Sequence, residues 1–103
     1  MKKTAAIVSA FLAAGSASSA LAGGDIEAGR IKGATCAVCH GKQGISSNPS
    51  VPNIAGQTKG YLAKSLREFR SGQRKDPSMN RIAERLSDAD IADLSTYYAS
   101  LPR

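Results

Sequence analysis

The sequence of 103 residues has no tryptophan, one histidine, two cysteines and two methionines, and aromatic residues make up only 5% of it. Two cysteines exclude a scaffold that is held together by many disulfides. A single histidine leaves few side chains that could coordinate a metal ion. The length allows one small domain. Because a chain this small with so few aromatic side chains has a weak core, we expect a metal ion, a disulfide or a large cofactor to help fill its interior.

The start of the sequence has the three parts of a secretory signal peptide. It opens with two lysines, continues with a short apolar run over residues 4–14, and reaches a small-x-small cleavage site at 20–22. The apolar run is well short of the ~20 residues that span a bilayer, so cleavage is favoured over an uncleaved anchor. We expect export to the periplasm and cleavage after Ala22. A single domain over residues 23–103 then remains, with its net charge lowered from +6 to +4 by the loss of the two lysines.

The remaining sequence predicts an all-α fold. Apolar residues at helical spacing follow residues that can cap a helix, and the predicted helices cover residues 26–36 behind Asp25, 59–71 behind Thr58, and 88–100 behind Ser87. No segment alternates apolar and polar residues convincingly, so no sheet is expected. Residues 41–57, rich in Gly, Ser, Asn and Pro, predict an ordered loop. Met79 is expected in a second loop, after Asp76-Pro77, with one or two helical turns over residues 80–86.

The chemistry is concentrated in the C-x-x-C-H segment formed by residues 36–40. This spacing is the attachment signature of c-type haem, because two thiols three positions apart can each form a thioether with one porphyrin vinyl group. The adjacent imidazole can then reach the iron. A zinc site usually needs about four ligands, of which this segment supplies three, and a thioredoxin-like dithiol usually lies in a βαβ context that is not visible here. We therefore predict one covalent haem c, attached through Cys36 and Cys39 and ligated by His40.

Met79 is the predicted second axial ligand. Once the signal peptide is removed, no second histidine remains and Met79 is the only thioether in the chain. Without haem, a lone methionine is better interpreted as core filler. With haem, ligation is favoured, and the alternative is an open iron or one ligated by Lys or Asn. An iron with His and Met on its two faces has no free position for oxygen or peroxide, which predicts a one-electron carrier and not an enzyme.

The chain resembles a class I c-type cytochrome, and specifically one haem domain of the cytochrome c4/c5/c-553 group. The resemblance lies in CAVCHG, in PNIAGQ followed by YL, in FRSGQRKDPSMNRIA and in LSDADIADLSTYYASL, in that order. It implies three main helices around one haem, with the N- and C-terminal helices crossing. It also implies the roles given above to Cys36, Cys39, His40 and Met79, and it makes Pro52 the carbonyl that accepts a hydrogen bond from His40. The alternative is that Pro52 only stiffens its loop.

The resemblance has one departure that bears on the helix crossing. Relatives often carry an aromatic residue three or four positions before the first cysteine, where this chain has Lys32 and Gly33. We therefore expect the crossing to rest on Gly29 against Tyr97 or Tyr98.

Charge and family resemblance together leave two functional hypotheses. The first is a free periplasmic electron shuttle whose redox partners have an acidic docking surface, because residues 59–85 contain eight basic and three acidic residues. The alternative for this block is a solvated face. The second hypothesis is a haem subunit that accepts electrons within a larger redox enzyme, from a flavoprotein as in flavocytochrome c sulfide dehydrogenase or in another sulfur-oxidising complex. Export and the scarcity of aromatics argue against a nucleic-acid partner, and residues 23–103 contain no predicted membrane span.

Overall fold

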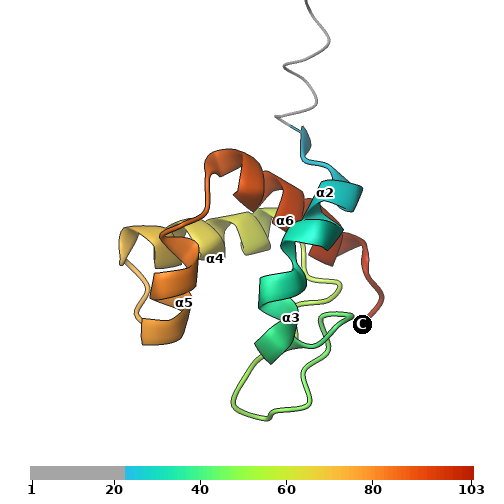
Figure 1. The fold of residues 1–103 in the computed structure, drawn as a ribbon, viewed down its shortest axis with the longest axis horizontal. Helices are drawn as coiled ribbons and strands as arrows, with labels where there is room; N and C mark the ends of the chain where they lie inside the picture. Colours follow the sequence, from blue (N-terminus) through green and yellow to red (C-terminus); the bar gives the residue numbers. More distant parts are fainter. Residues whose placement is uncertain (1–22) are drawn as a thin grey trace, which may run out of the picture.

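The computed structural model describes residues 23–103, and every regular element in this part of the chain is a helix (Figure 1). The helices are α2 (Ile26–Lys32), α3 (Ala34–His40), α4 (Lys59–Ser71), α5 (Pro77–Ala83) and α6 (Asp88–Ser100). The predicted absence of a sheet is thus confirmed for these residues. None of the helices described is long and apolar enough to cross a membrane. The predicted signal peptide and its cleavage site lie outside the described residues.

The helix starts are set by the caps that the sequence indicated. Asp25 and Thr58 each accept a hydrogen bond from a backbone N–H in the first turn of the helix that follows. Ser87 and Asp90 form a reciprocal capping box, in which each side chain accepts from the other residue's backbone N–H at 3.0 Å. Helix α4 ends at Gly72, whose φ of 83° is costly for residues with a side chain. The predicted bounds of α4 and α6 are confirmed.

The predicted end of the first helix was wrong. The chain does not leave helical structure near residue 36 but forms two consecutive helices, α2 and α3, which meet at Gly33 and continue to His40. Gly33 lowers helix propensity, yet its φ of −71° and ψ of −6° remain right-handed, so the chain changes direction there without unwinding. Helix α3 stops at Gly41, where φ reaches 88°. The whole C-x-x-C-H segment is therefore helical.

The predicted loop around Met79 was also wrong, because Met79 lies in the first turn of α5. The Asp76 side chain accepts hydrogen bonds from the backbone N–H groups of Ser78 and Met79 at 3.0 and 3.1 Å. Asp76-Pro77 was interpreted as a break between elements. It is instead a helix start, because aspartate is a strong N-cap and proline at the first helical position has a suitable φ and no N–H to leave unpaired.

The core lies where α6 packs against α2 on one side and α4 on another (Figure 1). Its buried cluster consists of Leu62 from α4 and Leu94, Tyr97 and Tyr98 from α6. Ile91 is also buried, so most of the apolar stripe that the sequence showed on this last helix does form core. Helix α5 packs on α4 alone among the described helices.

The crossing of α2 and α6 depends on a glycine, as predicted. A Cβ atom built on Gly29 would lie 2.1 Å from the backbone oxygen of Asp93 and 2.6 Å from Cβ of Tyr97. Where relatives often have an aromatic residue, Lys32 contributes an ion pair instead. Its Nζ lies 2.8 Å from Asp90 Oδ1 and 2.6 Å from Asp93 Oδ2. We call Lys32, Asp90 and Asp93 the α2–α6 ion cluster.

Candidate functional site

On helix α3, the two cysteines and the histidine of the C-x-x-C-H segment lie in different environments. Cys36 is half-buried and packs against the core cluster, whereas Cys39 and its neighbour Val38 are exposed. Both cysteines are free, and burial raises the pKa of the Cys36 thiol. Because residues three apart lie on one face of a helix, the two thiols share a face of α3. His40 follows directly and is buried, with only 9% of its surface exposed.

The His40 ring is held in one orientation by Pro52. Its Nδ1 lies 2.8 Å from the backbone oxygen of Pro52, which can only accept a hydrogen bond. The proton must therefore sit on Nδ1, and Nε2 keeps its lone pair free to bind a metal. A hydrogen bond of this kind fixes the ring and raises its basicity as a ligand.

The loop over residues 41–57 is ordered by backbone hydrogen bonds, and these position Pro52. The oxygen of Gly44 accepts from the N–H groups of Ile54 and Ala55, at 2.9 and 3.1 Å. Gly44 has a φ of 74°, and a Cβ there would lie 3.0 Å from the Ala55 nitrogen. Just beyond, the N–H of Gly56 donates to the backbone oxygen of Tyr98 at 2.9 Å. The loop is thus tied to α6 four residues after Pro52.

Met79 lies on a different element, and α5 does not pack against α3 in the part of the chain that the structure describes. In Figure 1 the two helices extend to the same side of α4 and α6 but remain separate. The Met79 side chain is half-buried. Its neighbour Asn80 anchors α5, because Asn80 Nδ2 donates to the backbone oxygens of Phe69 and Arg74, both at 2.8 Å. The sequence analysis missed Asn80, and only its position beside Met79 could have drawn attention to it.

The structure therefore gathers four of the predicted site residues and leaves the fifth apart. Cys36, Cys39 and His40 share α3, and Pro52 is hydrogen bonded to them through His40. Among residues 23–103, no three His, Cys, Asp or Glu side chains are arranged to hold a bare metal ion. Two free thiols on one helical turn beside an oriented, buried imidazole fit a porphyrin, which supplies the other ligands of its own iron.

The basic residues predicted as a block divide into paired and unpaired groups. Arg70 pairs with Asp88 at 2.9 Å, and Lys64 pairs with Glu68 at 2.7 Å. Arg74 lies over the Phe69 ring. Within residues 23–103, no ion pair is found for Lys75, Arg81 or Arg85. These three residues, which we call the α5 basic group, lie on or beside the Met79 helix.

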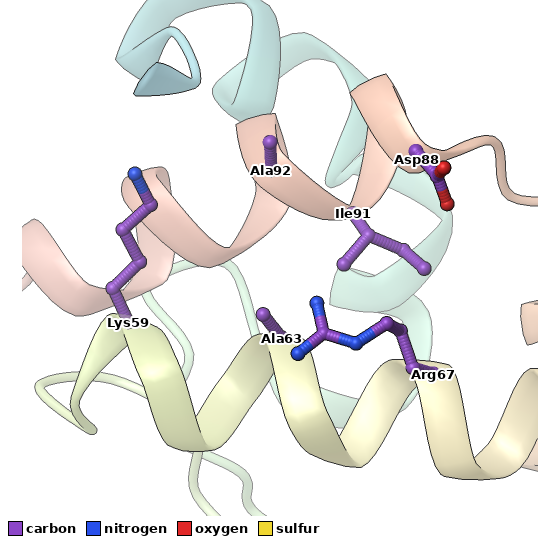
Figure 2. Close-up of a pocket in the computed structure, with 6 residues that line it drawn as sticks. All are labelled: Lys59, Ala63, Arg67, Asp88, Ile91 and Ala92. Carbon is purple, nitrogen blue, oxygen red and sulfur yellow. The ribbon is translucent and has the colours of Figure 1, made fainter. Parts of the chain in front are cut away.

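An open pocket of about 290 Å³ lies between α4 and α6 (Figure 2). It is lined by Lys59, Ala63, Arg67, Asp88, Ile91 and Ala92. The lining includes none of the predicted site residues, and it contains no thiol, thioether or imidazole. The pocket is therefore separate from the C-x-x-C-H site.

Comparison with known proteins shows which family shares this arrangement. The family model for cytochrome c matches residues 27–102. Cytochrome c-554(548) of Halomonas halodenitrificans is 45% identical over 80 residues, which cover 75% of this chain and 96% of that protein. The thiosulfate dehydrogenase electron acceptor of Thiomonas intermedia is 41% identical over 70 residues, or 66% of this chain and 32% of that protein. The crystal structure of reduced recombinant cytochrome c4 from Pseudomonas stutzeri has a TM-score of 0.73 at 38% identity, covering 77% of this chain and 46% of that one.

The chain thus spans about half the length of the cytochrome c4 relatives that it matches. The family match covers almost all of the described residues, and the structural likeness to cytochrome c4 confirms the predicted all-α cytochrome c fold. Haem c, the cofactor of this family, fits the two free thiols and the oriented imidazole of α3. The chain belongs to the cytochrome c family and is an electron-transfer protein that carries covalently attached haem c.

Proposed function

We propose that residues 23–103 form a single haem domain that carries one electron at a time between redox partners in the periplasm. In this proposal Cys36 and Cys39 form the thioether bonds, and His40 and Met79 are the axial ligands. The observation that carries it is the buried His40 ring, whose Nδ1 is engaged by Pro52 at 2.8 Å so that Nε2 is free. When bound, haem c supplies an iron that cycles between the ferrous and ferric states.

The residues of α3 hold and orient the cofactor in this proposal. Two thioether bonds from one helical turn keep the cofactor from escaping and hold the imidazole beside it at high effective concentration. The Pro52 carbonyl prevents the His40 ring from turning and makes it a stronger donor. Burial of that ring keeps water away from the ligand bond. Small movement between oxidation states follows, because the groups that hold the ligand belong to a helix and a hydrogen-bonded loop.

Met79 supplies a soft sulfur ligand, which favours ferrous iron and raises the reduction potential. Its support comes from α5, where Asp76 caps the first turn and Asn80 fastens the helix to α4. Because α5 is fixed on α4, Met79 would be harder to displace as a ligand than a residue on a loose loop, and it would keep small molecules from the second ligand position.

The ligand assignment is tested with Met79→Ala in the purified, haem-bearing protein. We expect the haem to stay attached, because the thioethers and His40 remain. The Met–Fe(III) charge-transfer band should disappear and the reduction potential should fall. Ile82→Ala on the same helix is the matched control and should keep the band. If Met79→Ala leaves both the band and the potential unchanged, Met79 is not a ligand.

The α5 basic group supports docking to an acidic partner near the Met79 helix, since unpaired surface charges steer association. Reversing the charge of Arg81 and Arg85 together to Glu should slow oxidation of the reduced protein by anionic ferricyanide and speed oxidation by a cationic cobalt complex. Lys42→Glu, on the loop after α3, is the control for net charge, which it changes by −2 where the double variant changes it by −4. If the double variant shifts the logarithm of the rate by only twice as much as Lys42→Glu, total charge alone accounts for the effect, which would contradict a local docking surface.

A second candidate function is a haem subunit that accepts electrons inside a larger enzyme. It is favoured by the relative named thiosulfate dehydrogenase electron acceptor, and a flavoprotein donor would fit the same role. The shuttle is favoured by cytochrome c-554(548), of which the chain covers 96%. Chromatography of a native periplasmic extract separates the two hypotheses. Elution at the size of one domain supports the shuttle, and stoichiometric co-elution with a larger protein supports the subunit. The intact mass of the same sample tests cleavage after Ala22 and the presence of haem.

A further inference from the structure

Asn80, the residue after Met79, engages its whole side-chain amide in hydrogen bonds to the backbone. Its Nδ2 donates to the backbone oxygens of Phe69 and Arg74, both at 2.8 Å. Its Oδ1 accepts from the backbone N–H of Asp76 at 2.9 Å. The amide nitrogen thus faces two acceptors and the amide oxygen faces a donor, so the two protons and the oxygen are each used once.

These three bonds join three parts of the chain. Phe69 lies in the last turn of α4, where carbonyl groups lack the partner that a further turn would supply, and its bond to Asn80 is partly buried. Arg74 lies in the connection between α4 and α5, and Asp76 is the N-cap of α5. A single side chain therefore fastens the end of one helix, the connection after it and the start of the next.

Met79 lies between the two residues that hold the first turn of α5. Before it, the Asp76 side chain accepts from the N–H of Met79 at 3.1 Å. After it, Asn80 ties the turn to α4. At the other end of the helix, Ala83 is fully buried. Asn80 is thus the tie between α4 and the end of α5 that bears Met79.

Helix α5 has little else to hold it. It has seven residues, and helices of this length are marginal on their own in water. Among the helices of residues 23–103 it packs on α4 alone, apart from α2 and α3 (Figure 1). Without the Asn80 amide, the backbone oxygens of Phe69 and Arg74 would be left to water. The turn that carries Met79 would then be free to leave α4.

We propose that Asn80 is a positioning residue for Met79, and that its side-chain amide limits how often the Met79 sulfur leaves the iron. This inference rests on the proposed function, in which Met79 is an axial ligand. Asn80 acts through the backbone of α5 and not through the sulfur. When the sulfur leaves, its position is open to a small neutral ligand such as imidazole. This exchange replaces one neutral donor with another, so no electron or proton is transferred.

The test measures how fast imidazole replaces Met79 in the purified, ferric, haem-bearing protein, followed by loss of the Met–Fe(III) charge-transfer band. Imidazole is raised until the rate no longer increases, so that departure of the sulfur limits it. Asn80→Ala removes all three bonds, and we expect it to raise this limiting rate about tenfold. A limiting rate within about twofold of the wild-type value would overturn the proposal.

Asn80→Asp shows which of the bonds matter. At neutral pH it keeps an acceptor for the Asp76 N–H but has no donor for the backbone oxygens of Phe69 and Arg74. We expect it to raise the limiting rate at least severalfold, because the tie to α4 is lost. A wild-type rate in this variant would show that the tie to α4 does not hold Met79, which would also overturn the proposal.

Gly29→Ala separates positioning from a general loss of stability. A Cβ at this position meets Asp93 and Tyr97 where α2 crosses α6, and α5 packs on neither of these helices in the described part of the chain. This variant should be less stable to urea and yet keep the limiting rate within about twofold of the wild-type value. An acceleration equal to that of Asn80→Ala would mean that the sulfur leaves by unfolding of the whole domain, and would refute a positioning role.

A measurement on the wild type decides the matter if neither Asn80 variant accumulates. Asn53 is the reference, because its Oδ1 accepts from the N–H of Ser46 while its Nδ2 has no hydrogen bond within residues 23–103. By NMR, the two Nδ2 protons of Asn80 should exchange with water at least about tenfold more slowly than those of Asn53. Equal exchange rates would show that the Asn80 bonds do not persist, and would overturn the proposal.

Failure of this inference is distinguishable from failure of the proposed function. A wild-type protein without the Met–Fe(III) band would refute Met79 as a ligand, and this inference with it. A wild-type protein with the band, together with Asn80 variants that bind imidazole at the wild-type rate, would leave the electron carrier and its ligands intact and refute only the role of Asn80.

Discussion

Replacing Gly29 with alanine tests the close approach between α2 and α6. In an isolated helix this change is favourable by about 1 kcal/mol, because alanine loses less conformational freedom than glycine. In the folded protein the added Cβ would lie 2.1 Å from the backbone oxygen of Asp93 and 2.6 Å from Cβ of Tyr97. Real Cβ atoms essentially never approach atoms of residues beyond their chain neighbours closer than 3.0 Å. Since neither obstacle is the tip of a flexible side chain, α2 and α6 must separate by about 1 Å.

The cost of that separation outweighs the gain in helix propensity. Overpacking of a well-packed contact typically costs 1–3 kcal/mol and occasionally more. Moving α2 outward also stretches the α2–α6 ion cluster, in which Lys32 Nζ lies 2.6 Å from Asp93. We expect Gly29→Ala to lower the free energy of unfolding by about 2 kcal/mol, which for a domain of this size lowers the Tm by about 10 °C.

Gly60→Ala is the matched control. Gly60 also lies in a helix, but nothing is found within 4 Å of a Cβ built on it. This variant should raise the Tm by a few degrees, following helix propensity alone. Both variants are measured by thermal unfolding of the haem-bearing protein, monitored by far-UV circular dichroism. A Gly29→Ala protein as stable as the wild type would refute the steric argument, and so would a rise in Tm equal to that of Gly60→Ala.

Two further predictions concern the α2–α6 ion cluster. Asp93→Asn removes the charge that faces Lys32 while keeping an acceptor for the Asp25 N–H, so urea unfolding should show a loss of about 2 kcal/mol; a loss below about 0.5 kcal/mol would contradict a role for the charge. The hydrogen bond from Lys32 lowers the pKa of Asp90 below its unfolded value, so its stabilising effect is complete above about pH 4 and is lost as the pH falls through the lower folded pKa. Asp90→Asn should therefore flatten the dependence of stability on pH in the acid range, and an unchanged profile would contradict this coupling.

Features that depend on neighbouring residues could be predicted from the sequence. The caps formed by Asp25, Thr58 and Ser87 act within one helical turn, and so does the stop at Gly72. The C-x-x-C-H spacing is likewise local. The error at Met79 came from a one-sided interpretation of Asp76-Pro77, since residues that can interrupt a helix can also begin one.

Features that depend on contacts between segments far apart in the sequence were harder to predict from the sequence. Gly29 could be assigned to the crossing only because family resemblance supplied the crossing itself. The partners of Lys32 lie 58 and 61 positions further along the chain, and no local pattern indicates that either of them pairs with Lys32. The inward direction of the Tyr98 hydroxyl is equally non-local, because helical periodicity assigns a tyrosine to the core without saying which polar group it meets.

The contact between α2 and α6 also constrains the order in which the parts of the protein can fold. Asp25 and Asp93, hydrogen bonded at 2.8 Å, are separated by 68 positions, so this interface closes a long loop and has a high entropic cost. During synthesis the first helix must wait for almost the whole remaining chain before it finds its partner. Until then the segment with the two cysteines lacks the wall that shields Cys36. In the proposed function, the Cys36 thiol is therefore most accessible for thioether formation while α6 is undocked.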